Sequence, residues 1–324
     1  GLEYLLLSCN HRIHNKNKVV SQAGFTLLEM VLVLFLISLM ASATLFLTEN
    51  VEDQAKYDET KRRMDIIRQA IVGDPTRQIN GRTEISGFAA DMGRIPSCLR
   101  ELLEQLDCGG TALPDWNIDV STGITAGWRG PYIQVIPEGS DLRFRDGYAN
   151  SDTSDAQNSG WAEFTPDTSN GIISITSEGF DINIITDDVE DTELISSSDW
   201  QHTSPISAQF TIKNIGSDAK PEGDANVLLR VYDKTFTDFI DGNASFNITS
   251  GALTSFTQLQ NNFTLDSPAA ISAGEQGYTL VCFNVPAGPP EDYIVFDGDC
   301  VNDVSSALPS SSTIKKFTIA PRQN

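Results

Sequence analysis

One apolar segment constrains this chain more than any other feature. From Phe25 to Leu47, 23 residues contain a single ionisable side chain, that of Glu29. As an α-helix rising about 1.5 Å per residue, this segment spans roughly 35 Å, which is enough to cross the hydrocarbon core of a bilayer. We therefore expect residues 25–47 to form a transmembrane helix.

The position of Glu29 indicates how this helix is used. An unpaired carboxylate one turn inside an apolar segment costs on the order of 2–3 kcal/mol, so we expect a cation to meet it. The first 24 residues carry three Lys or Arg residues against one Glu, and a basic flank stays in the cytoplasm, so the rest of the chain is exported. If the chain is cut after Gly24, the new amino group of Phe25 emerges at the depth of Glu29, where a neighbouring copy can use it as the cation.

The run Gly24-Phe25-Thr26-Leu27-Leu28-Glu29 resembles the processing site of type IV pilins and of the pseudopilins of type II secretion. The resemblance implies a leader at residues 1–24, cleavage by a prepilin peptidase between Gly24 and Phe25, N-methylation of Phe25, and filament assembly through Glu29. The alternative is a plain signal anchor, in which Glu29 lies near the membrane interface and reaches toward water.

Charge and motifs exclude several functions. The chain has 44 Asp and Glu against 22 Lys and Arg, a formal net charge of −22, which repels phosphate backbones and argues against a nucleic-acid partner. It contains no G-x-S-x-G, Walker or dinucleotide fingerprint, and His202, the one histidine after the apolar segment, has no evident nucleophile partner. We predict that the protein is not an enzyme.

Four cysteines remain once Cys9 leaves with the leader. An even number in an exported chain indicates disulfides. Of three possible connectivities we expect the local one, Cys98–Cys108 and Cys282–Cys300, with each bridge contributing roughly 3 kcal/mol. Four buried thiols are the alternative, and no spacing suits zinc.

A cluster of acidic side chains, Asp187, Asp188, Glu190 and Asp191, follows the middle of the chain. Carboxylate oxygens are ligands for Ca²⁺, so calcium is one candidate cofactor. The alternative is a solvated acidic linker, because the order of residues does not follow the D-x-[DN]-x-[DN]-G pattern. No other cofactor is expected.

The first half of the chain predicts an α+β fold. No Gly or Pro interrupts residues 26–72, and apolar residues recur at helical spacing up to Ile71, so one long helix is expected, closed by Gly73. A second, short helix is expected near Leu99–Leu106. Alternation predicts strands at 132–136, 142–146, 161–165, 171–177 and 180–185. Together with GWRGPYI at 127–133, these features resemble a pilin-like domain over residues 73–190, in which the long helix packs on an antiparallel sheet.

Residues 191–324 read as a separate all-β domain. Seven alternating runs, at 208–216, 226–233, 244–250, 254–266, 276–286, 292–299 and 314–321, are separated by turn residues. Seven short strands of this kind predict an immunoglobulin-like sandwich.

Two functions follow from the resemblance. The first is a structural subunit of a type IV pilus-like or type II secretion pseudopilus filament, which lies in the bacterial inner membrane before assembly and in a periplasmic or extracellular filament afterwards. Its partners are then other pilin-like subunits, the prepilin peptidase, and an assembly platform with its ATPase. The second is a minor tip subunit whose β-sandwich binds a surface, a glycan or an exported substrate. Ser38 and Phe46 stand where many major subunits carry the helix breakers Gly and Pro, which favours a minor role.

Overall fold

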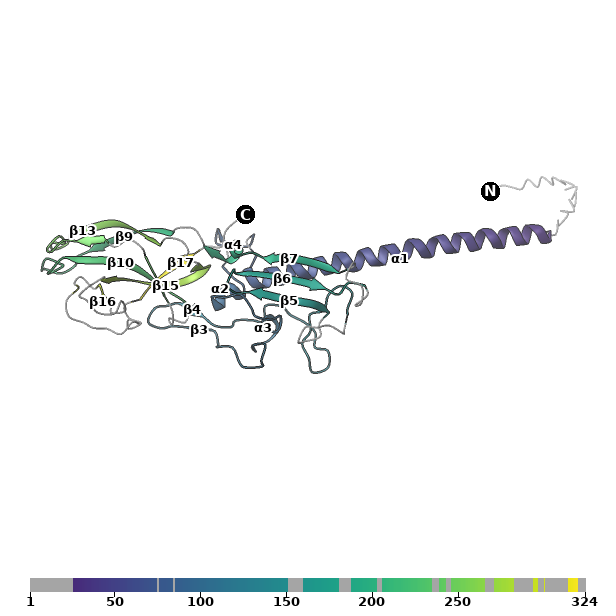
Figure 1. Ribbon diagram of the computed structural model, residues 1–324, viewed down its shortest axis with the longest axis horizontal. Coiled ribbons are helices and arrows are strands. Elements are labelled where there is room, and N and C mark those ends of the chain that lie inside the picture. The colour runs from purple at the N-terminus through teal and green to yellow at the C-terminus, as the bar shows by residue number, and fades with distance from the viewer. Residues whose placement is uncertain are drawn as a thin grey trace, which may run out of the picture. The chain divides into compact units, whose positions relative to one another are not determined.

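The computed structural model combines one long helix, antiparallel sheets and a strand-rich C-terminal region (Figure 1). It describes residues 26–74, 76–83, 85–150, 160–180, 188–202, 206–234, 239–242, 246–265, 271–282, 294–296, 300 and 314–319. The chain forms two compact units, up to Glu52 and from Asp53 onward.

The predicted long helix is present as α1, Leu27–Val72. It ends where the sequence indicates, because Gly73 adopts a left-handed φ of 79° that residues with a Cβ rarely adopt. The Gly73 N–H donates to the Gln69 carbonyl at 2.8 Å, which satisfies one of the free carbonyls at the helix end.

In the second unit, the last turns of α1 bury an apolar face. The side chains of Met64, Ile67 and Ile71 are all at most 1% exposed. They belong to one hydrophobic core with residues of the antiparallel sheet β5-β6-β7, formed by β5 (Trp161–Asp167), β6 (Ile172–Ser177) and β7 (Val189–Ile195). The predicted packing of a helix on an antiparallel sheet is confirmed.

Two expected strands in this region are wrong. Residues 132–136 and 142–146 form no strand and lie in loops. Ile133 and Phe144 are nevertheless buried, because the alternating side chains enter the core while the backbone pairs with no neighbouring strand. The N–H groups of Tyr132 and Ile133 both donate to the Leu102 carbonyl.

Other expectations need smaller corrections. β7 is a strand in the stretch interpreted as an acidic linker or calcium loop, and the strand expected at 180–185 falls, apart from Phe180, outside the described residues. The helix expected near 99–106 is reduced to α3, Arg100–Leu103. The sequence reading did not anticipate α2 (Phe88–Met92) or the short hairpins β1–β2 (Gln78–Ile79, Arg82–Thr83) and β3–β4 (Asn117–Ile118, Thr125–Ala126).

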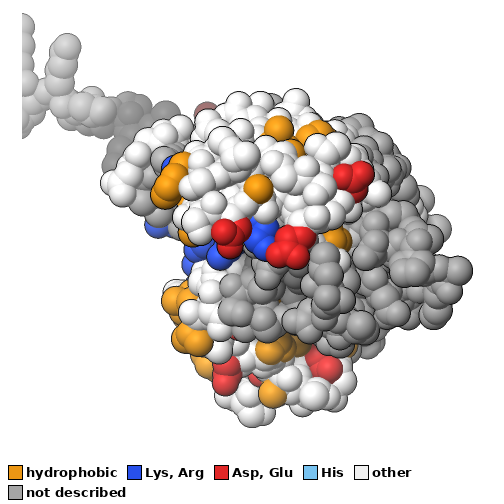
Figure 2. All heavy atoms as spheres, turned by 90° about the vertical axis from the view of Figure 1, so that its left-hand side faces the viewer, with side chains coloured by type: hydrophobic (Ala, Val, Ile, Leu, Met, Phe, Trp, Pro, Cys, Tyr) orange, Lys and Arg blue, Asp and Glu red, His pale blue; other side chains and the backbone are white. Residues whose placement is uncertain are grey.

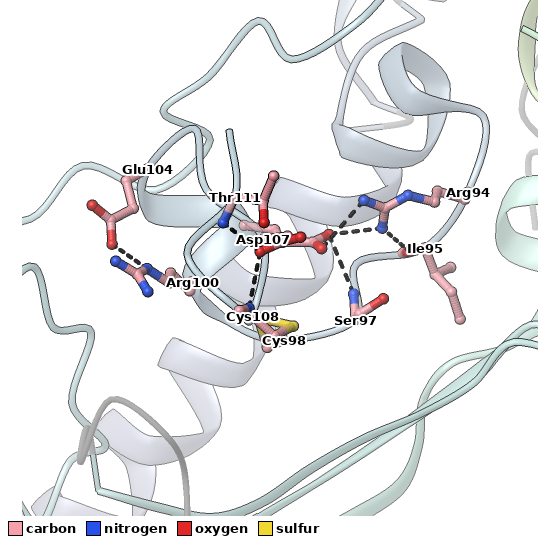
Figure 3. The surroundings of a disulfide bond; sticks show 11 residues. Arg94, Ile95, Ser97, Cys98, Arg100, Glu104, Asp107, Cys108 and Thr111 are labelled. Atoms are coloured by element: carbon pink, nitrogen blue, oxygen red, sulfur yellow. Dashed lines mark hydrogen bonds and ion pairs between the residues drawn. A yellow bond between two sulfur atoms is a disulfide. The ribbon is translucent and has the colours of Figure 1, made fainter. Parts of the chain in front are cut away.

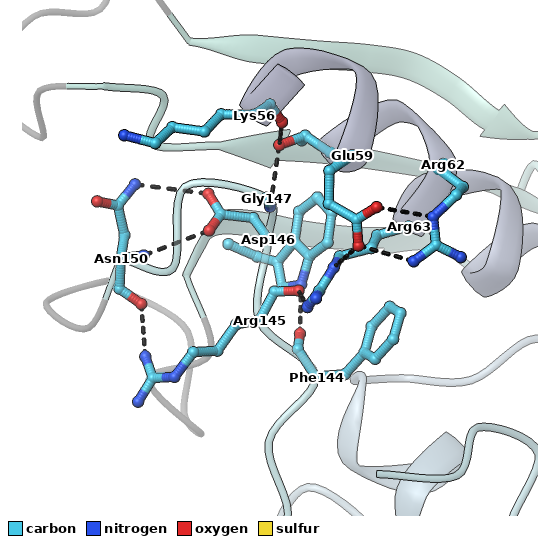
Figure 4. A network of polar contacts seen from close by, with 11 residues as sticks. Lys56, Glu59, Arg62, Arg63, Phe144, Arg145, Asp146, Gly147 and Asn150 are labelled. Atoms are coloured by element: carbon cyan, nitrogen blue, oxygen red, sulfur yellow. Dashed lines mark hydrogen bonds and ion pairs between the residues drawn. The ribbon is translucent and has the colours of Figure 1, made fainter. Parts of the chain in front are cut away.

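A polar network fastens α1 to the loop before β5 (Figure 4). Arg63 donates to the Arg145 carbonyl at 2.6 Å, and the Gly147 N–H donates to Thr60 Oγ1 at 3.0 Å. Hydrogen bonds from Arg62 and Arg63 lower the pKa of Glu59 to about 2. These contacts hold the loop backbone directly against the helix surface.

The C-terminal region contains two antiparallel sheets that share one hydrophobic core. β9 (Ile206–Lys213) pairs with β13 (Gln258–Leu265). In the larger sheet, β10 (Ala225–Tyr232) pairs with β15 (Gly274–Cys282), β11 (Phe239–Asp241) and β12 (Phe246–Ile248), while β15 also pairs with β16 (Ile294–Val295) and β17 (Lys315–Ile319). Rings from both sheets meet: Phe210 lies 5.4 Å from Phe263 and 5.1 Å from Tyr278, centroid to centroid.

Each of the seven predicted runs overlaps one of these strands, whereas β11 was not anticipated. A short connection, made of α4 (Ser197–Trp200), β8 (Gln201–His202) and its partner β14 (Ile271–Ser272), links this region to the helix-bearing one. At α4, Arg68 of α1 forms an ion pair with Asp199.

Within the second unit, the strand-rich region contacts the loop that carries β3 and β4. Lys234 Nζ donates to the Thr125 carbonyl at 3.3 Å, and Glu275 accepts hydrogen bonds from the Thr125 N–H and hydroxyl at 3.0 Å each. Lys316 bridges Glu275 and the Gly123 carbonyl, both at 2.9 Å. Lys234 is only 6% exposed, and this burial lowers its pKa to about 8.

A substitution at Gly147 tests how closely the loop before β5 approaches α1. A Cβ at this position would lie closer than 3.0 Å to Lys56 O and to two atoms of Thr60. We expect Gly147→Ala to lower the free energy of unfolding by about 1–3 kcal/mol, because the backbones must move apart. Gly223→Ala is the matched control, since, apart from its two chain neighbours, no heavy atom of the described residues lies within 4 Å of its Cβ position. Denaturant unfolding of the full chain in detergent measures both, and equal effects would contradict the close approach.

The lowered pKa of Lys234 makes the free energy of unfolding depend on pH. Between about pH 8 and pH 10 the unfolded chain holds a proton on this lysine that the folded chain has released, so stability should rise with pH. The charged groups acting on Lys234 are Glu275, Asp91 and Lys316. Relative to Lys234→Met, the wild-type free energy of unfolding should increase by about 1–3 kcal/mol across this range. Parallel curves for the two proteins would show that Lys234 stays protonated.

Candidate functional site

The N-terminal end of α1 is the first candidate site, and Thr26 organises it. The Glu29 N–H donates to Thr26 Oγ1 at 3.2 Å, and the Met30 N–H donates to the Thr26 carbonyl at 3.1 Å. Thr26 is therefore the N-cap of the helix, with Glu29 three residues after it, as in a capping box. The sequence reading missed this role, although the order Thr-x-x-Glu is its signal. Gly24 and Phe25 lie outside the described residues.

Glu29 sits in the first turn of α1, where the helix dipole favours a negative charge. Its side chain is exposed, and within residues 26–43 and the rest of the described chain no cation forms an ion pair with it. This first turn thus presents an accessible carboxylate among apolar neighbours.

The following turns expose apolar side chains on every side of the helix. Twelve large hydrophobic residues are between 42% and 84% exposed: Leu27, Leu28, Met30, Val31, Leu32, Val33, Leu34, Phe35, Leu36, Ile37, Leu39 and Met40. A helix that is apolar all round is stable only when lipid or protein covers it. This half of α1 is therefore built for an environment that one copy of the chain does not supply.

The transmembrane assignment of residues 25–47 stays a prediction. Across the part of the chain that the structure describes, no helix carries an apolar run long enough for a membrane crossing.

Both expected disulfides are present, each with its Cα atoms 5.8 Å apart. Cys98–Cys108 closes the loop around α3 (Figure 3). Beside it, Glu101 is buried and accepts hydrogen bonds from Arg94 at 2.7 Å and 3.2 Å. Cys282–Cys300 links the end of β15 to a residue of the C-terminal core.

Among the residues that the structure describes, the possible metal ligands do not gather into an evident site. In the described part of the chain, the one compact group of candidate ligand atoms is Cys98, Glu101 and Cys108, and its sulfurs are bonded to each other while its carboxylate pairs with Arg94. This group is structural.

The predicted calcium ligands are only partly in view. Asp187 lies outside the described residues. Asp188 directly precedes β7, and Glu190 and Asp191 are adjacent within it, so the last two side chains point to opposite faces of the strand. Calcium binding by these residues remains a prediction.

The GWRGPYI segment packs as a structural element. Trp128 donates to the Glu101 carbonyl at 2.7 Å, and Tyr132 donates to Asp91 at 3.0 Å. Arg129 forms an ion pair with the same Asp91 carboxylate at 3.1 Å. Burial raises the pKa of Asp91, although the charge of Arg129 opposes this shift.

Comparison with known proteins bears on the N-terminal end. Residues 20–45 match the prokaryotic N-terminal methylation motif, the prepilin signal of type IV pilins and pseudopilins. The predicted resemblance is confirmed for this segment, and a pilin-type signal indicates a structural subunit rather than an enzyme. No curated protein and no solved structure matches the chain.

Proposed function

We propose, starting from the prepilin signal at residues 20–45, that this protein is a structural subunit of a type IV pilus-like or type II secretion pseudopilus filament. A prepilin peptidase cuts between Gly24 and Phe25 and leaves Phe25 as the N-methylated first residue. The match to the methylation motif is the observation that carries this proposal.

The exposed apolar half of α1 supports assembly. Twelve bare hydrophobic side chains are covered first by the inner membrane and then, as subunits leave the bilayer, by the same helices of neighbouring subunits. An assembly platform and its ATPase drive this transfer. The folded unit from Asp53 onward stays on the periplasmic or extracellular side.

Glu29 is the residue that sets the register between subunits. Its exposed carboxylate in the first turn of α1 pairs with the Phe25 amine of the adjacent subunit. In an apolar surrounding a matched charge pair is strongly preferred to a misaligned one, because a buried charge without a partner is costly.

A second candidate is a minor subunit at the filament tip. The C-terminal region has a hydrophobic core of its own, which we interpret as an immunoglobulin-like sandwich that presents a binding surface. α1 runs without a break from Leu27 to Val72, as expected if Ser38 and Phe46 replace the breakers of major subunits. Subunit counting in purified filaments separates the two roles: a few copies identify a tip protein and hundreds identify a body protein.

Processing gives the first test. Intact-mass analysis of the exported protein should give a chain that begins at Phe25 and carries one methyl group on its amine. The same analysis of Gly24→Val, in which a bulky side chain occupies the cut site, should give the uncut chain. A native protein that retains residues 1–24 would contradict the proposal.

The Glu29 pairing gives the second test. Glu29→Gln should reduce filament yield by about tenfold or more, because the Phe25 amine loses its counter-charge in an apolar core. The thermal unfolding of the unit from Asp53 onward should not change. Asp53→Asn, an exposed acid on the same helix, is the control and should assemble normally. Normal filament yield from the Glu29 variant would refute the pairing.

A further inference from the structure

A groove of about 500 Å³ opens between the two sheets of the C-terminal region. One side is formed by β9 and the turn after it, from Phe210 to Gly216, and the other by Tyr278–Leu280 of β15. The volume is that of a pocket for a drug-sized ligand or a short peptide.

The groove lies at the point along β15 where the neighbouring strand changes from β17 to β16. β17 pairs with β15 up to Tyr278, and β16 begins to pair with it at Val281. Between these two registers the Phe296 N–H donates to the Leu280 carbonyl at 2.8 Å. The residues Tyr278–Leu280, which line the groove, span this change of partner.

The floor of the groove consists of core side chains that are not fully covered. Phe210 and Ile212 of β9, Tyr278 and Leu280 of β15, and Phe296 all pack against the hydrophobic core as partly buried residues. Their counterparts deeper in the same core, such as Phe263, are at most a few per cent exposed. The sandwich core is therefore accessible along this edge.

β9 also offers a backbone edge. Among the described strands it pairs only with β13, through all eight of its residues. On its second edge no strand of the described residues pairs with the N–H and C=O groups, and this is the edge to which an added strand would bind.

The charge of the groove is opposite to that of the chain. Among the described residues, its lining includes Lys213, Lys220 and Lys315 and no acidic residue, although the chain has twice as many acids as bases. Lys220 pairs with Glu222 at 3.2 Å, whereas Lys213 and Lys315 are exposed and form no ion pair within the described chain. Figure 2, which faces this end of the strand-rich region, shows hydrophobic side chains at the surface and basic ones close to acidic ones.

We infer that this groove binds an extended acidic segment of another polypeptide. The segment adds its backbone to the free edge of β9 and places alternate apolar side chains against Phe210, Tyr278 and Phe296. Its carboxylates meet Lys213 and Lys315. A free strand edge together with an apolar floor favours a peptide over a glycan, since a glycan cannot complete the backbone pairing.

This inference goes beyond filament assembly and concerns a different segment of the chain. It uses the exported location that the prepilin signal provides. If the groove does not bind an acidic peptide, filament yield and cleavage before Phe25 are still as the filament proposal expects. The two proposals can therefore fail separately.

The probe is a fluorescein-labelled synthetic peptide of about eight residues, the length of a typical strand, that alternates Val or Phe with Glu. Fluorescence anisotropy with the full mature chain in detergent measures binding. The double variant Lys213→Gln/Lys315→Gln should weaken binding by about fivefold to tenfold, as expected for two charge contacts at a groove rim. The control Gln134→Glu/Thr168→Glu changes net charge equally at exposed positions outside the groove and should bind within twofold of wild type.

Two further probes separate the sources of binding. The same peptide with alternate amides N-methylated should bind at least about tenfold more weakly, because it cannot pair with β9. A peptide with Lys in place of Glu should not bind. Equal binding of the N-methylated or Lys-containing peptide would overturn the inference, as would tighter binding by polygalacturonate that displaces the acidic peptide.

Discussion

The packing of the last turns of α1 against the β5-β6-β7 sheet is the interaction on which the first folded region depends. Met64, Ile67 and Ile71 are buried there almost completely, while the preceding half of the same helix exposes equally apolar side chains. One continuous helix therefore carries two kinds of hydrophobic surface. The chain itself buries the apolar face near the end of α1, whereas the exposed apolar side chains from Leu27 to Met40 have to be covered by lipid or by another protein.

Strong local signals were readable from sequence. A long stretch without Gly or Pro predicted α1, and Gly73 marked its end because a left-handed residue is needed there. The seven C-terminal runs each overlap a strand, since their alternation matches a sheet with one buried face. Alternation failed at 132–136 and 142–146, where prolines flank or precede the segments and side chains enter the core from unpaired backbone. β7 was missed because its exposed acids concealed the apolar residues Val189, Leu194 and Ile195.

The candidate sites also divide into those that a local sequence signal reveals and those that depend on the three-dimensional fold. Glu29 and the cysteine pairs could be named from spacing alone, because a lone acid in an apolar helix and an even set of exported cysteines have few explanations. The groove between β9 and β15 could not, because it depends on how strands of two different sheets come to lie opposite each other. That arrangement is decided by long-range packing, which no short stretch of sequence encodes.

The order of strands along the chain constrains how the C-terminal region can close. β15 is completed at Cys282, but β17, which covers its outer edge from Gly274 to Tyr278, begins only at Lys315. Lys316 then bonds to Gly123, almost two hundred residues earlier. Because the chain is made from its N-terminus, this edge of β15 has no β17 partner until Lys315 and the residues after it are added, and during that interval it is exposed to wrong strand pairing or to capture by a folding helper.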